Sequence, residues 1–160
     1  MKSEKILVLL DSKNNENLLN LSVSLAKNDK STLYFIYVVE VPHKYPVEYE
    51  IGNQISLGEN LLREANNFLS KKRLEYDINS ENFILVQSRN AGVATIKESK
   101  RINPDTIIFS KKINYQIMRN SHYPWKKLSF FVVLTSFQGT NYLYKSILKN
   151  IFSGITILNF

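Results

Sequence analysis

Compact apolar runs recur along the chain and are separated by longer amphipathic stretches. Four such runs, rich in Val, Ile, Leu, Phe and Tyr, lie at 5–10, 32–39, 82–86 and 106–109. Each run is continuous and does not alternate strictly between apolar and polar residues, which is typical of strands covered on both faces. The pattern therefore predicts four strands of a parallel sheet.

The stretches between these runs show helical periodicity. Apolar side chains recur at helical spacing over 15–28, 55–76 and 91–101, which favours amphipathic helices. The second helix is expected to begin with a capping box formed by Ser56 and Glu59. Asn103 followed by Pro104 is expected to end the third helix. Alternating strands and helices predict an α/β fold with right-handed crossovers.

The segment 40–53 interrupts this alternation. It carries residues that break regular structure, namely Pro42, Pro46 and Gly52, so we predict a loop. It also carries three ring side chains, namely His43, Tyr45 and Tyr49. These rings either line a pocket or a partner surface, or they belong to a plain surface connection between the second strand and the second helix.

The last third of the chain is less regular. Residues 111–125 are polar and basic with interleaved aromatics, whereas 128–137 and 155–158 favour strands and 139–150 favours a helix. The pattern therefore predicts further strands after the first four, within an α/β fold that has a parallel sheet. Residues 1–160 are expected to form a single domain, with 111–138 a divergent basic insertion within it.

The charge distribution is uneven. The net charge is +7, yet basic and acidic residues balance up to Asp105. After Asp105 the chain has no acidic residue and seven basic ones, which are Lys111, Lys112, Arg119, Lys126, Lys127, Lys145 and Lys149. This asymmetry indicates an anionic partner, such as a nucleotide, a nucleic acid or a membrane surface. The alternative is a basic face that only contacts solvent.

Several function classes are disfavoured by what the sequence lacks. There is no cysteine, which excludes disulfides, thiolate metal sites and a cysteine nucleophile. The two histidines, His43 and His122, have no metal-binding spacing, and no G-x-S-x-G motif occurs. We therefore expect a protein that is not an enzyme. The apolar runs are too short for a signal-peptide core or a membrane span, so we expect a cytoplasmic protein without a transmembrane segment.

Several local sequences, taken in order, resemble the universal stress protein family. Residues 5–12 (KILVLLDS) are similar to the family's first strand, which ends in an acidic residue, and 38–42 (VVEVP) resembles the exit of its second strand. Further similar segments follow at 86–96, 104–109 and 139–157. The resemblance covers most of the chain except 111–138.

The resemblance implies an open, doubly wound sheet of five parallel strands with helices on both faces, to which this chain adds an extra C-terminal strand or insertion. It also implies a homodimer formed through the last strand, and ATP or another adenine nucleotide as ligand. In such sheets ligands bind at the carboxyl ends of the strands. The residues expected at that edge, and hence the candidate cofactor-binding residues, are Asp11, Val39, Ser110, Gly139 and Thr140. Asp11 and Thr140 have an alternative role as turn or helix-capping residues.

The phosphate-binding motif of the family is incomplete in this chain. ATP-binding members carry two glycines after the fourth strand, because bare backbone can approach the phosphates closely. Here Ser110 and Ile113 stand in their places, and the Gly139-Thr140 pair lies farther along the chain than the motif requires. A β-branched side chain at 113 fills the space that a phosphate needs.

Three functions follow from these observations. The first is a regulatory, non-catalytic stress-protein-like binding domain with a degenerate nucleotide site. The second is an ATP- or AMP-binding stress protein with a displaced phosphate loop. The third is a docking module, such as a regulator of a membrane transporter, that uses its last third to bind a protein or an anionic surface. The docking residues would be Lys111, Lys112, Arg119, Lys126 and Lys127.

Overall fold

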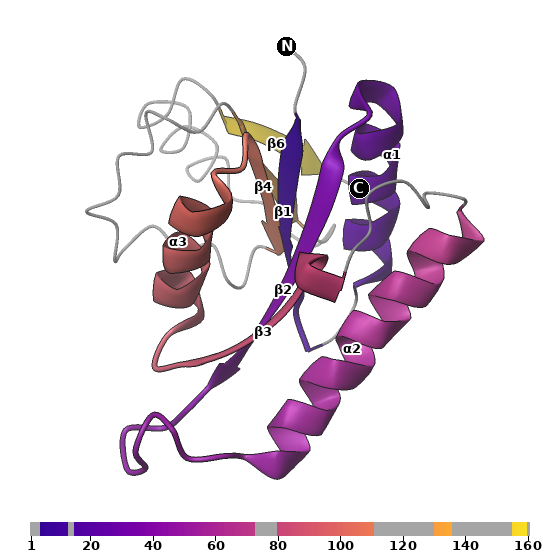
Figure 1. Ribbon diagram of the computed structural model, residues 1–160. Coiled ribbons are helices and arrows are strands. Elements are labelled where there is room, and N and C mark those ends of the chain that lie inside the picture. Colours follow the sequence, from indigo (N-terminus) through magenta and orange to yellow (C-terminus); the bar gives the residue numbers. More distant parts are fainter. Residues whose placement is uncertain (1–3, 13–14, 73–79, 111–129, 136–154, 160) are drawn as a thin grey trace.

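The strands form one parallel sheet. The computed structural model describes residues 4–12, 15–72, 80–110, 130–135 and 155–159 (Figure 1). The described strands pair in the order β3-β2-β1-β4-β5-β6, and every adjacent pair is parallel. Their bounds are β1 Lys5–Leu9, β2 Thr32–Glu40, β3 Phe83–Ser88, β4 Thr106–Ser110, β5 Phe130–Thr135 and β6 Ile155–Asn159. The predicted parallel α/β class is confirmed, with six strands among the described residues.

Helices cover both faces of the sheet. α1 (Glu16–Asp29) and α2 (Gly52–Lys71) lie on one face, whereas α3 (Ala91–Ile102) lies on the other (Figure 1). A short 3₁₀ turn, η1 (Ser80–Asn82), precedes β3. Among the described helices, none is both long and apolar enough to cross a membrane. The helix predicted at 139–150, the continuation of the second helix to 76 and the insertion at 111–138 lie outside the described residues.

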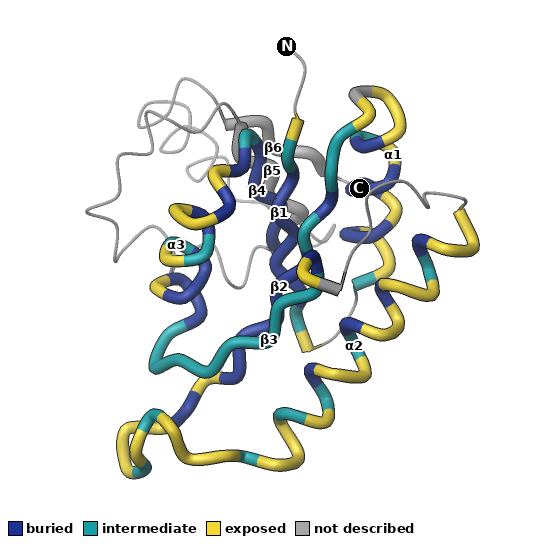
Figure 2. The backbone as a smooth tube through the Cα atoms, in the orientation of Figure 1, coloured by how far each residue is buried: buried dark blue, intermediate teal, exposed yellow. Residues whose placement is uncertain are grey.

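Strand geometry explains why the apolar runs are continuous. Successive side chains of a strand point to opposite faces, and both faces are buried here (Figure 2). In β1, Ile6 and Val8 join the core beneath α1 and α2, whereas Leu7 and Leu9 join the core beneath α3. The ring of Phe35 in β2 stacks on the ring of Phe83 in β3, with 5.6 Å between the ring centroids. The apolar runs thus belong to two separate cores.

The structure corrects one helix end and confirms another. α2 begins at Gly52, with Ile51 at the N-cap and no side-chain cap, so the predicted capping box at Ser56 is wrong. Ser56 lies inside the helix, and the backbone carbonyl of Ile51 already accepts the N–H of Ile55 at 3.0 Å. α3 ends as predicted, because Asn103 adopts a left-handed conformation (φ 53°) in front of proline.

Candidate ligand cavity at the carboxyl ends of the strands

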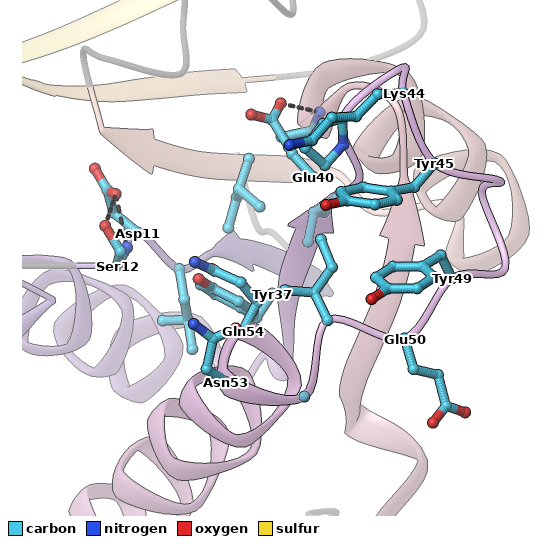
Figure 3. Close-up of a pocket in the computed structure, with 17 residues that line it drawn as sticks. Asp11, Ser12, Tyr37, Glu40, Lys44, Tyr45, Tyr49, Glu50, Asn53 and Gln54 are labelled. Atoms are coloured by element: carbon cyan, nitrogen blue, oxygen red, sulfur yellow. Dashed lines mark hydrogen bonds between the residues drawn. The ribbon is translucent and has the colours of Figure 1, made fainter.

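A cavity of about 730 Å³ lies where β1 and β2 end (Figure 3). Its walls come from the segment that connects β2 to α2, from the first turn of α2 and from Ala91 at the start of α3. The polar and aromatic side chains among those that line it are Asp11, Ser12, Tyr37, Glu40, Lys44, Tyr45, Tyr49, Glu50, Asn53 and Gln54. Ligands of open α/β sheets bind at this edge, and the volume falls in the usual range for small-molecule sites.

Asp11 is tied into the turn between β1 and α1. Its N–H donates to Asn15 Oδ1 at 2.9 Å, and Asn15 Nδ2 donates back to the Asp11 carbonyl at 2.7 Å. The Asp11 carboxylate accepts the N–H of Ser12 at 2.7 Å. Asn15, not Asp11, occupies the N-cap position of α1. Asp11 is therefore a turn residue, and it also lines the cavity.

The other predicted site residues are not among the described residues that line the cavity. Val39 is fully buried in the core beneath α1 and α2, and its neighbours Val38 and Glu40 line the cavity instead. Val39 lies on the opposite face of β2 from Val38 and Glu40, because successive side chains of a strand alternate between the two faces. Ser110 is the last residue of β4 and pairs in register with Leu134 of β5. Gly139 and Thr140, and the basic residues of 111–127, lie outside the described residues.

Glu40 connects the end of β2 to the start of α3. Its Oε1 accepts the N–H of Ala91, the first residue of α3, at 2.8 Å. Asn90 caps the same helix, since its Oδ1 accepts the N–H of Val93 at 3.1 Å. A carboxylate is favourable at a helix N-terminus because the helix dipole is positive there. Glu40 was not among the site residues predicted from the sequence, although it lies in the VVEVP segment at 38–42.

The segment between β2 and α2 is an ordered loop, as predicted. Two turns follow one another, because Tyr45 N–H donates to the carbonyl of Pro42 and Tyr49 N–H donates to that of Pro46, each at 3.1 Å. These turns stack the rings of Tyr45 and Tyr49 with 4.4 Å between centroids and 11° between planes. Lys44 Nζ lies 4.8 Å from the Tyr45 ring. Both tyrosines line the cavity, as one of the two interpretations of this segment expected, whereas His43 is not among the described lining residues.

Side chains from the end of β3 and the residue after it hold this loop in place. Gln87 Nε2 donates to the carbonyl of Tyr49 at 2.9 Å, and Arg89 Nη1 donates to the carbonyl of Pro42 at 2.6 Å. Each bond fixes one of the two turns. The aromatic wall of the cavity is therefore positioned by residues distant in sequence, and no local motif marks them.

The described lining of the cavity is acidic although the chain carries a net charge of +7. Among the described residues, Asp11, Glu40 and Glu50 contribute carboxylates to it and Lys44 contributes an ammonium group. Burial raises the pKa of the Tyr37 phenol above its ordinary value, and the charges of Asp11 and Glu40 raise it further. The cavity thus disfavours additional negative charge.

The raised pKa of Tyr37 predicts a pH-dependent stability. Above the ordinary pKa of 10.0, the unfolded chain loses the phenol proton while the folded protein still holds it. The free energy of unfolding therefore decreases as the pH rises above 10.0. Tyr37→Phe is expected to show a shallower decrease in urea unfolding across this range. Equal slopes for both proteins would contradict the assignment.

Comparison with solved structures identifies the fold. A universal stress protein from Archaeoglobus fulgidus in complex with dAMP superposes with a TM-score of 0.56 at 14% identity, covering 84% of this chain and 98% of that one. A second structure of the universal stress protein from this organism gives 0.57 at 13% identity, covering 84% and 94%. The chain has the universal stress protein fold. A universal stress protein in complex with cAMP also matches, with a TM-score of 0.56 at 14% identity, covering 84% and 97%.

The likeness to universal stress proteins is one of structure. No protein-family model matches the chain, and no curated protein sequence matches it. The resemblance inferred from segments such as 5–12 and 38–42 is thus confirmed for the fold. Two of the three solved universal stress proteins named above hold adenine mononucleotides.

Proposed function

We propose that this protein is a regulatory, non-catalytic binding domain whose cavity binds the adenosine part of an adenine nucleotide. The observation that carries the proposal is the cavity at the ends of β1 and β2, which combines tyrosine rings with carboxylates in a universal stress protein fold. The dAMP and cAMP complexes of proteins with this fold support an adenine ligand.

The lining chemistry suits a nucleoside. The carboxylate of Asp11 can accept hydrogen bonds from ribose hydroxyls or from the adenine amino group. The side-chain amides of Asn53 and Gln54, in the first turn of α2, can both donate to and accept from the base. The tyrosine rings supply apolar surface for stacking.

The same lining does not suit a chain of phosphates. Every added phosphate brings negative charge close to Asp11, Glu40 and Glu50, and among the described lining residues only Lys44 carries a charge that offsets it. Ser110 and Ile113 also replace the glycines that a phosphate loop requires. We therefore propose that affinity decreases from adenosine to AMP to ATP. A degenerate nucleotide site of this kind still recognises the nucleoside.

Calorimetric titration with adenosine, AMP and ATP tests the proposal. Adenosine is expected to bind saturably at one site, and Asp11→Asn is expected to weaken its binding about fivefold, because a charged acceptor becomes a neutral one. Glu59→Gln is the matched control, since Glu59 is exposed on α2 away from the cavity lining. The absence of saturable binding by any of the three compounds would refute the proposal. An ATP affinity above that of adenosine would favour a displaced phosphate loop instead.

Two further predictions concern partners. Docking on an anionic surface or a transporter through 111–127 stays a prediction, because those residues lie outside the described ones. If this segment docks through its charge, partner binding must weaken steeply with salt.

A homodimer is likewise proposed from the family resemblance. Sedimentation at micromolar concentration tests it.

A further inference from the structure

Two turn hydrogen bonds and two hydrogen bonds from distant side chains hold the Tyr45–Tyr49 pair in place. Each ring belongs to its own proline-initiated turn, and the two rings are nearly parallel at 4.4 Å. Proline fixes its own backbone φ and so reduces the entropy that the loop loses on ordering. Gln87 and Arg89 bond to the carbonyls of the two turns. The rings therefore keep their positions without help from a ligand.

Part of this pair is exposed at the cavity wall. Tyr45 has a stacked ring on one side and the Lys44 ammonium group over it at 4.8 Å. Tyr49 is 48% exposed, and among the described residues no second ring or ammonium group is found over it. Both tyrosines line the cavity, to which β2 also contributes the Tyr37 ring (Figure 3). A rigid aromatic ring exposed at a cavity wall is a surface on which a flat ligand ring can stack.

We propose that the Tyr45–Tyr49 pair is a preformed stacking surface that makes the cavity select a purine over a pyrimidine. This inference rests on the proposed function, since it assumes that a nucleoside occupies the cavity. Stacking strength rises with the area of the two overlapping rings, and a purine offers two fused rings where a pyrimidine offers one. Because the loop is already ordered, ordering it adds little cost on binding.

The test compares three ligands and three proteins. Adenosine, uridine and ribose are titrated into the wild type, Tyr49→Leu and Tyr49→Phe. The wild type is expected to bind adenosine at least about tenfold more tightly than uridine, and ribose not measurably. Tyr49→Leu is expected to weaken adenosine binding about tenfold and to reduce the adenosine-to-uridine ratio. Tyr49→Phe, which keeps the ring, is expected to retain both values.

The possible failures are distinguishable. If Tyr49→Leu leaves the adenosine-to-uridine ratio unchanged, the ring only supports the loop and the stacking surface is refuted, although the proposed function stands. If the wild type binds neither nucleoside, both proposals fall. Thermal melting of Tyr49→Leu shows whether the variant is folded. Should it be unfolded, Tyr49→His, which keeps a flat ring, must preserve the purine preference or the inference fails.

Discussion

Gly58→Ala is expected to destabilise the protein by about 1–2 kcal/mol, although alanine is the better helix former. A Cβ atom at this position would lie 2.5 Å from Leu85 Cδ1 and 2.6 Å from Tyr37 Cδ1. The Leu85 methyl group can rotate away, but the Tyr37 ring is 5% exposed and sits between α2 and the sheet. The overlap must be relieved by moving α2 or the ring, and that cost exceeds the gain in helix propensity.

Gly52→Ala is the matched control for this substitution. Gly52 is the first residue of the same helix, and a Cβ atom there would meet nothing within 4 Å. Its substitution is expected to leave stability unchanged or to raise it by up to about 1 kcal/mol. Urea unfolding of both variants measures the difference. A Gly58→Ala protein as stable as the wild type would show that α2 does not press on Tyr37.

Glu40→Gln is expected to raise the affinity for AMP by about tenfold while changing that for adenosine by less than about twofold. The glutamine keeps an acceptor for the N–H of Ala91, so the join between β2 and α3 is preserved. It removes one negative charge from the cavity lining, and AMP carries up to two such charges on its phosphate. Glu40 is exposed, so salt screens this repulsion and the effect should be largest at low ionic strength.

Calorimetric titration at two salt concentrations measures this effect, with Glu59→Gln again as the control. Removing the carboxylate from the N-terminus of α3 is expected to lower the free energy of unfolding by no more than about 1 kcal/mol. An equal change in AMP and adenosine affinity would mean that Glu40 acts on the shape of the cavity. In that case its charge does not set the preference among ligands.

The strands and the end of α3 could be predicted because their causes are local. Continuous apolar runs mark strands with two buried faces, and Asn103 before Pro104 cannot continue a helix. The start of α2 could not be predicted in this way. Ser56 and Glu59 match a capping box, but the same spacing also occurs on the solvent face of an amphipathic helix. The helix begins directly after Ile51, at the end of the loop that follows β2. Hydrogen bonds from Gln87 and Arg89, which are distant in sequence, fix the position of that loop.

The candidate site was only partly predictable for a similar reason. Asp11 could be found because an acidic residue directly after a buried strand falls at the ligand edge of a parallel sheet. Glu40 meets Ala91 across 51 residues of sequence, and Gln87 meets Tyr49 across 38. Tyr37 lies within an apolar run and looks like an ordinary core residue. Such pairings come from the folded sheet and leave no pattern in the sequence.

The attachment of the loop to β3 has a consequence for how the cavity opens. β3 is the outermost strand on its side of the described sheet and pairs only with β2, and every residue in it is half-buried. Edge strands separate from a fold at lower free energy than central ones. The aromatic wall of the cavity is therefore attached to an edge strand of the described sheet. If the carboxyl end of β3 separates from β2, the loop that carries Tyr45 and Tyr49 loses its hydrogen bonds to Gln87 and Arg89 and can move away from the cavity. The strands β1, β2 and β4 would stay paired.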